Sequence, residues 1–142
     1  MLIAYASMYG NTEAAAQALA GKLCEKGVTN VTVCDVSNTH VSYLISEAWK
    51  YSHIVLASVT YNLGIYPVMH NFLMDMKALN LQNRTFALIE NGSWAPMAAR
   101  VMRSMLEESK EITYTDTTVR ISAALDDASL TQITALADEL AK

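Results

Sequence analysis

Three short segments of the sequence combine hydroxyl, amide and aromatic side chains with glycine, and each follows an apolar run of strand length. They span residues 7–12, 58–66 and 91–95, and none of them contains Cys, His, Lys, Asp or Glu. The segments therefore offer no nucleophile with an adjacent base and no strong general acid or base. Any redox chemistry at these segments has to come from a bound cofactor.

The first segment suits a phosphate group. It carries hydroxyls, an amide and one glycine, and a helix is expected to begin within it. Backbone N–H groups and the positive end of a helix dipole can hold a phosphate without a lysine. The segment lacks the GxxxxGK[ST] pattern of a P-loop and the GxGxxG pattern of a dinucleotide-binding turn, and simple helix capping by Thr12 is the alternative. The candidate phosphate residues are Ser7, Met8, Tyr9, Gly10, Asn11 and Thr12.

The second and third segments suit a flat heterocycle. Tyr61, Tyr66 and Trp94 provide rings that can stack on such a group, while short polar side chains and backbone groups can contact its edge. A single aromatic residue in a loop is usually an ordinary surface residue, but three beside a phosphate site favour a planar phosphorylated cofactor. The candidate residues are Ser58, Val59, Thr60, Tyr61, Asn62, Leu63 and Gly64, followed by Asn91, Gly92, Ser93 and Trp94.

Alternating strand and helix patterns position these segments. Apolar runs predict five strands, and the stretches between them have helical periodicity, with Pro67 and Pro96 in first helical turns and Gly27 just past a helix end. The expected strands are residues 2–6, 31–36, 53–59, 84–90 and 112–119, and the expected helices are about 12–26, 41–51, 67–79, 96–108 and 130–140.

This alternation predicts a three-layer α/β fold, in which helices cover both faces of a doubly wound, five-stranded parallel sheet. The strands at 53–59 and 84–90 are almost continuously apolar, as central strands are, whereas the strand at 112–119 is half polar, as an edge strand is. The strand order 2-1-3-4-5 fits these features and brings the three segments to one crevice. No linker divides the chain, so we expect a single domain over residues 1–142.

Composition disfavours several classes of function. With 14 acidic and 10 basic residues, the net charge is -4, which provides no general basic field for nucleic acid or an anionic membrane surface. The apolar runs are too short to cross a membrane, and the chain lacks a secretory signal pattern, so we expect a cytoplasmic protein. Cys24 and Cys34, interpreted as buried, and the three histidines lack the spacing of a metal site, and no metal is predicted.

Three motifs resemble segments of a known family. Residues 7–13 resemble the phosphate loop of flavodoxins, (S/T)xTGNT, and residues 58–67 resemble the flavin loop that follows it. The flavodoxin-like domain of flavodiiron proteins (A-type flavoproteins) is the closer match, because its SPTYNNGIYP and ENGSWAP segments are mirrored by residues 58–67 and 90–96. The resemblance covers essentially the whole chain and implies a short-chain flavodoxin fold. Departures from the usual residues occur at Tyr9, Val59 and Leu63.

The resemblance implies non-covalent FMN. By analogy, the phosphate is held by Ser7, Tyr9, Gly10, Asn11 and Thr12. Residues 60–64 and 91–94 enclose the isoalloxazine, with Tyr61 or Trp94 as a stacking partner. A carbonyl beside Leu63 or Gly64 is the nearest candidate to turn toward N5–H of the reduced flavin. The iron-binding domain of flavodiiron proteins has no counterpart in these 142 residues, and both an excised domain and a free-standing flavodoxin fit the sequence.

The implied function is electron transfer. An FMN module of this kind would accept electrons from a reductase or rubredoxin-like donor and pass them to an acceptor, in the flavodiiron case a diiron centre. We expect redox partner proteins, no nucleic acid and no membrane. Electron transfer is favoured over an enzyme activity of the chain's own.

Two other functions stay open. The first is an FMN-dependent NAD(P)H:quinone-type reductase, and because such enzymes are usually dimers, a homodimer is compatible with the sequence. The second is a cofactor-free interaction module on the same fold. A response-regulator receiver domain is disfavoured, since Ala6 and Ser7 stand in place of its acid pair, and Ala57 and Ser58 stand in place of its phosphoacceptor aspartate.

Overall fold

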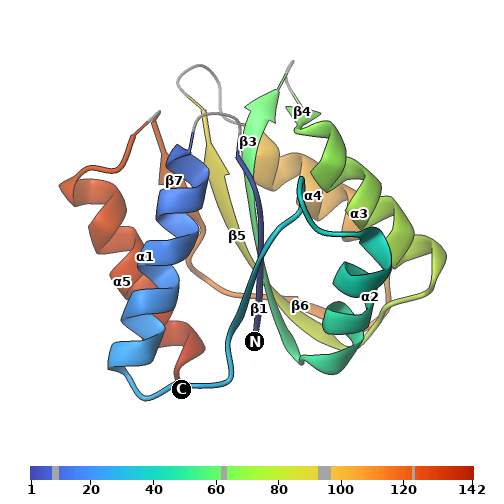
Figure 1. Cartoon of the computed structure of the whole chain (residues 1–142), viewed down its shortest axis with the longest axis horizontal. Coiled ribbons are helices and arrows are strands. Elements are labelled where there is room, and N and C mark those ends of the chain that lie inside the picture. Colours follow the sequence, from blue (N-terminus) through green and yellow to red (C-terminus); the bar gives the residue numbers. More distant parts are fainter. Residues whose placement is uncertain (8–9, 62–63, 93–96, 123) are drawn as a thin grey trace.

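Alternating strands and helices form three layers in the computed structural model, which describes residues 1–7, 10–61, 64–92, 97–122 and 124–142 (Figure 1). Helices α1 (Asn11–Glu25) and α5 (Asp127–Leu140) cover one face of the sheet, and α2 (Val41–Lys50), α3 (Pro67–Ala78) and α4 (Ala98–Leu106) cover the other. The strands are β1 (Leu2–Ala6), β2 (Thr32–Asp35), β3 (His53–Tyr61), β4 (Gly64–Ile65), β5 (Arg84–Asn91), β6 (Ile112–Tyr114) and β7 (Val119–Ile121).

The sheet has the predicted order. Its parallel strands run β2-β1-β3-β5-β6, which is 2-1-3-4-5 when the predicted strands are counted along the chain. Ala6 lies opposite Ser58, and Ser58 lies opposite Glu90. The carboxyl ends of β1, β3 and β5 therefore lie side by side, and the α/β fold class is confirmed.

The second candidate segment contains a hairpin that the sequence did not predict. β3 continues to Tyr61 and pairs antiparallel with β4, so that Thr60 lies opposite Ile65 and Tyr61 lies opposite Gly64. The connecting residues 62–63 lie outside the described part of the chain. They lack the Asn-Gly or Asp-Gly pattern that usually signals a two-residue hairpin, which is why periodicity alone predicted a loop here.

The predicted strand at residues 112–119 is two short strands. β6 pairs with β5 at Arg84–Phe86, and β7 pairs with β5 at Ile89–Asn91. Between them, the backbone N–H groups of Asp116 and Thr117 donate to the carboxylate of Glu139 on α5. This side chain satisfies donors that the interrupted strand cannot pair within the sheet.

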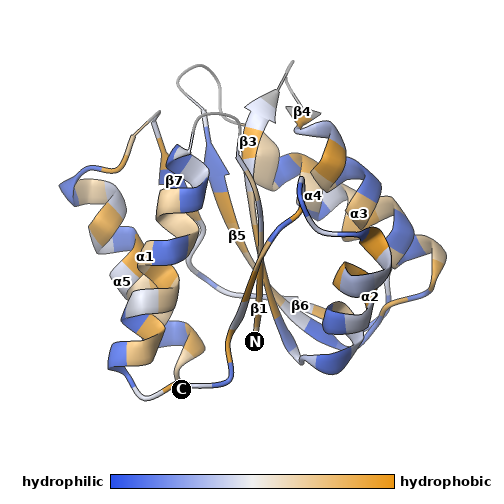
Figure 2. Cartoon of the chain, viewed as in Figure 1, coloured by the Kyte–Doolittle hydropathy of each residue, from blue (hydrophilic) through white to orange (hydrophobic). Residues whose placement is uncertain are grey.

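Apolar side chains cover both faces of the central strands. Leu56 and Leu88 lie in the cluster under α2, α3 and α4, whereas Val55 and Ile89 lie in the cluster under α1 and α5. The middle of β5 is hydrophobic and its carboxyl end is hydrophilic (Figure 2). Polar chemistry is therefore concentrated where the strands end.

Glycines occupy the positions just outside both ends of α1. Gly10 is the N-cap with φ 88°, and Gly27 follows the C-cap with φ 86°. Gly27 N donates to Cys24 O at 3.0 Å, and Val28 N donates to Leu23 O at 3.0 Å. This pattern closes the helix end and confirms the predicted role of Gly27.

Three local predictions have a different outcome. Thr12 is not the cap of α1, because it lies inside the helix and its side chain is buried. Cys34 is buried as expected, but Cys24 is exposed. Pro96, the predicted helix start, lies outside the described residues, and α4 is described from Ala98.

The Glu139 contact makes stability depend on pH. Burial opposes ionisation of Glu139, but the N–H groups of Asp116 and Thr117 outweigh it and hold the pKa below the usual 4.5. The stabilisation is therefore present above pH 4.5 and is lost as the pH falls through the lower pKa of the folded state. We expect Glu139→Gln to lower the free energy of unfolding at pH 7 by about 1 kcal/mol or less, because the site is partly exposed.

Urea unfolding of the two chains between pH 3 and 7 measures this effect. The difference in the free energy of unfolding between the wild type and Glu139→Gln should become smaller at the acid end of the range. A difference that is constant with pH would contradict the role of the carboxylate charge, and Asp127→Asn at the start of α5 is the control for removing a negative charge from the same helix.

Candidate cofactor site

The amino end of α1 lies at the carboxyl edge of the sheet, directly after β1 (Figure 1). The first-turn N–H groups of Asn11, Thr12 and Glu13 have no acceptor within the helix, as at any helix start. Among the described residues, no side chain caps this turn at the Gly10 N-cap. Three backbone donors and the positive helix end therefore point to one place, which suits an anion.

The other helices begin with their own partners. His40 Nδ1 accepts a first-turn N–H of α2 at 3.1 Å, a carboxylate oxygen of Glu90 accepts one of α4 at 3.1 Å, and Asp126 Oδ1 accepts one of α5 at 2.8 Å. The first helical residue of α3 is Pro67. Within the described ranges, α1 is thus the helix whose start has neither a side-chain acceptor nor a proline.

Ser7 and Gly10 shape the turn into α1. Gly10 N donates to Ser7 Oγ at 2.9 Å. The hydroxyl of Ser7 can still donate its own hydrogen to an anion. Gly10 has φ 88°, a left-handed conformation that glycine adopts without steric cost.

A buried contact joins the first segment to the third. Asn91 Nδ2 donates to Thr12 Oγ1 at 3.4 Å, and only 5% of Asn91 and 1% of Thr12 are exposed. The Thr12 hydroxyl is thus turned toward the sheet. As the acceptor in this contact, the Thr12 hydroxyl keeps its own hydrogen to donate, and the Thr12 backbone N–H is a second donor for an anion.

The acidic residue of the first turn is held by the sheet. Tyr5 Oη donates to Glu13 Oε1 at 3.1 Å. Burial and this hydrogen bond raise the pKa of Tyr5 to about 12. Tyr5 therefore stays protonated at neutral pH and holds the Glu13 side chain against β1.

The hydroxyls of Ser58 and Thr60 in the second segment form hydrogen bonds with backbone groups of the protein. Ser58 is fully buried, and its Oγ donates to Val59 O at 3.1 Å and lies 3.4 Å from the donor Tyr66 N. Thr60 Oγ1 accepts from Met97 N at 3.1 Å, which joins the second segment to the chain shortly after the third. Tyr66 packs against the apolar cluster under α3 and α4, so its ring belongs in part to the core.

The structure brings together those site residues that it describes. Gly92 N donates to Ile121 O at 3.0 Å and so lies beside β7 at the same edge. The backbones of Tyr61 and Gly64 pair in the hairpin. Direct contacts of all these residues with a cofactor stay a prediction. Six predicted site residues lie outside the described ranges: Met8, Tyr9, Asn62, Leu63, Ser93 and Trp94.

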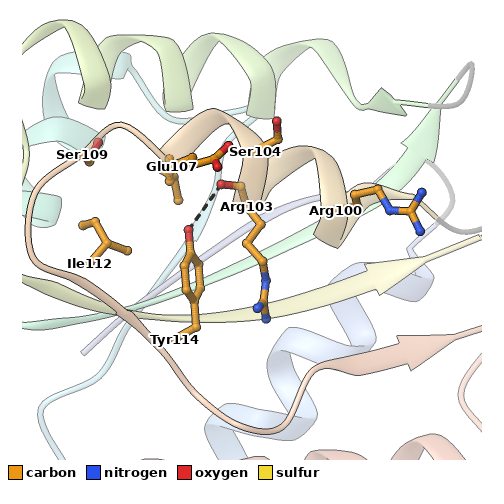
Figure 3. Close-up of a pocket in the computed structure, with 8 residues that line it drawn as sticks. Arg100, Arg103, Ser104, Glu107, Ser109, Ile112 and Tyr114 are labelled. Carbon is orange, nitrogen blue, oxygen red and sulfur yellow. Dashed lines mark hydrogen bonds between the residues drawn. The ribbon is translucent and has the colours of Figure 1, made fainter.

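Two surface hollows lie elsewhere. One, of about 440 Å³, lies between α4 and β6, and another, of about 410 Å³, lies between α2 and α3. In the first, the Arg103 guanidinium lies 4.5 Å from the centre of the Tyr114 ring, and Tyr114 Oη donates to Arg103 O at 3.4 Å (Figure 3). These groups already contact each other, and the predicted cofactor residues line neither hollow.

Two further features bear on function. In the part of the chain that the structure describes, no helix has the length and apolar character needed to cross a membrane. The same residues contain no group of three or more His, Cys, Asp or Glu side chains that could hold a metal.

Sequence reasoning missed Glu90 and Arg120. Glu90 Oε2 accepts from Arg120 Nε at 2.8 Å at the carboxyl end of β5, where β5 pairs with β7. The sequence did contain a signal for Glu90, because this glutamate directly follows the apolar run Phe86–Ile89. A charged residue is almost never buried in such a place unless it has a partner. Its partner could not be found in the same way, because the contact depends on how β5 and β7 align.

Gly10, the N-cap of α1, and Gly21, inside α1, give a matched test of the turn. An added Cβ meets no described atom within 4 Å at Gly10 or at Gly21, but only Gly10 has a positive φ. We expect Gly10→Ala to destabilise the chain by about 1–2 kcal/mol. Gly21→Ala, inside the helix, should instead stabilise it by about 0.5–1 kcal/mol.

Urea unfolding without added cofactor measures both effects. Stabilisation by Gly10→Ala would contradict the left-handed geometry of the turn.

Comparison with known proteins places the chain in a family. The family model described as flavodoxin matches residues 3–130. The chain spans about a quarter of the length of the curated relatives it matches, 27% of one and 26% of another.

Solved structures agree with this match. The rubredoxin oxygen:oxidoreductase of Desulfovibrio gigas is 26% identical with a TM-score of 0.90, and the match covers 99% of this chain and 34% of that one. An archaeal flavodoxin is 23% identical with a TM-score of 0.85, covering 99% and 94% of the two chains. A flavodiiron core from Synechocystis, 19% identical with a TM-score of 0.80 and covering 98% and 36%, shares the fold.

The family also identifies a cofactor class. Flavodoxins bind FMN, which is the cofactor that the sequence predicted. The match over residues 3–130 and the observed strand order lead to the same conclusion. This chain belongs to the flavodoxin family.

Proposed function

We propose that this chain binds FMN non-covalently and serves as an electron-transfer module. The observation that carries the proposal is the first turn of α1, which has no side-chain cap among the described residues and lies beside the ends of β3 and β5. Membership of the flavodoxin family supports the phosphate of FMN as the anion for this turn.

The residues at the edge fit such a group. The N–H groups of Asn11, Thr12 and Glu13, with the Ser7 hydroxyl, would hold the phosphate. The ends of β3 and β5, with the segments at 60–64 and 91–94, would enclose the ring. When bound, FMN supplies one- and two-electron redox chemistry. The chain binds, orients and shields the cofactor, a task that requires no acidic or basic side chain in the three segments.

Redox partners are the finer part of the proposal. We propose that electrons arrive from a reductase or a rubredoxin-like donor and leave to a protein acceptor or a further domain, such as a diiron centre. The support is that one similar protein is a rubredoxin oxygen:oxidoreductase and another is a flavodiiron core. This chain covers 34% and 36% of those two chains, so the activity of the whole oxidoreductase is not assigned to these residues.

Titration of the apoprotein with FMN and with riboflavin tests the proposal. We expect the fluorescence of both flavins to be quenched when they bind the protein, with riboflavin bound about 100-fold more weakly than FMN. Hydrogen bonds to a charged group contribute about 1.5–3 kcal/mol each, and about 3 kcal/mol corresponds to this factor. Equal affinities for FMN and riboflavin would contradict the role of α1 in binding the phosphate. Failure of the protein to bind either flavin would contradict the whole proposal.

The alternative of a reductase has its own readout. An electron-transfer module loaded with FMN should oxidise NADH or NADPH only slowly when no partner reductase is present. Rapid oxidation of either nucleotide by the isolated protein, with a quinone as acceptor, would instead favour the reductase.

A further inference from the structure

Glu90 is a buried carboxylate that the proposed FMN contacts do not use. It lies at the carboxyl end of β5 opposite Ser58, and only 2% of it is exposed. A charge at this depth is unfavourable unless hydrogen bonds and an opposite charge compensate for it. The hydrogen-bond donors around Glu90 therefore show how its buried charge is compensated.

Two donors from different elements satisfy this carboxylate. Oε1 accepts from Ala99 N in the first turn of α4 at 3.1 Å. Oε2 accepts from Arg120 Nε on β7 at 2.8 Å. The Arg120 side chain remains 64% exposed, so the pair has one buried charge and one charge facing solvent.

These contacts lie on both sides of the third segment. Glu90 precedes it, Gly92 lies near its start, and Met97 and Ala99 follow it. Further bonds hold the same ends, because Gly92 N donates to β7 and Met97 N donates to β3. Glu90 contacts both α4 and β7, so its carboxylate joins the two ends of the segment.

We propose that Glu90 is a positioning residue of the flavin site: it holds the carboxyl end of β5 and the amino end of α4 at a fixed separation, and with Arg120 it sets the local charge at the carboxyl end of β5. The inference rests on the proposed binding of FMN. It adds that flavin affinity and redox potential depend on this ion pair.

The two members of the pair should affect the potential in opposite directions. Removal of the Glu90 charge leaves the Arg120 cation, which favours the addition of electrons to bound FMN and raises the midpoint potential. Removal of the Arg120 charge leaves the buried carboxylate and lowers the potential. Loss of structure alone would not produce shifts of opposite sign.

The test uses Glu90→Gln, Arg120→Gln and the double variant. Each single variant should weaken FMN at least 10-fold, and riboflavin by the same factor, because the phosphate turn is untouched. The midpoint potential should rise in Glu90→Gln, fall in Arg120→Gln and return close to that of the wild type in the double variant.

A matched control separates positioning from loss of stability. Glu139→Gln is the same substitution at another carboxylate that accepts two hydrogen bonds, here both from backbone N–H groups, but Glu139 lies on α5 beside residues 116–117. It should leave flavin affinity and potential unchanged. If Glu139→Gln weakens FMN as much as Glu90→Gln does, the inference fails.

Other outcomes are equally decisive. If Glu90→Gln does not fold, Arg120→Gln still tests the pair, because the arginine is largely exposed. Unchanged affinity and potential in Arg120→Gln, with FMN bound by the wild type, would overturn this inference alone. A wild-type chain that binds no FMN would overturn the proposed function as well.

Discussion

Parallel pairing of β1, β3 and β5 is the constraint on which the rest of the molecule depends. Because the three strands run in one direction, the segments that follow them leave the sheet at one edge. Burial on both faces requires apolar strands, and polar groups are concentrated where the strands end (Figure 2). Backbone donors can then hold an anion at the start of α1 without a lysine in that turn. An overall charge of -4 is compatible with such a site.

Much of the fold could be predicted because it follows from local patterns. β1 has the predicted bounds, and α3 begins at Pro67, where a missing N–H has no cost. The apolar runs around Leu56 and Leu88 identified the central strands, and Gly27 identified a helix end. The common location of the three candidate segments could also be predicted, because it follows from strand order rather than from side-chain contacts.

Features that depend on distant contacts could not be predicted. The break between β6 and β7 lies where Glu139 of α5 accepts two backbone N–H groups, and no pattern within residues 112–119 predicts this contact. Thr12 has the character of a cap, but its contact with Asn91 and the backbone of Gly10 place it inside the helix. Each of these features requires the alignment of elements that only the folded chain provides.

Amide NMR spectra of the chain during titration with FMN test the central claim most directly. The account predicts that Gly10, Asn11 and Thr12 shift strongly with FMN and only weakly with riboflavin, while residues at the ends of β3 and β5 shift with both. Shifts centred on the hollow between α4 and β6, with the first turn of α1 unchanged, would contradict the account.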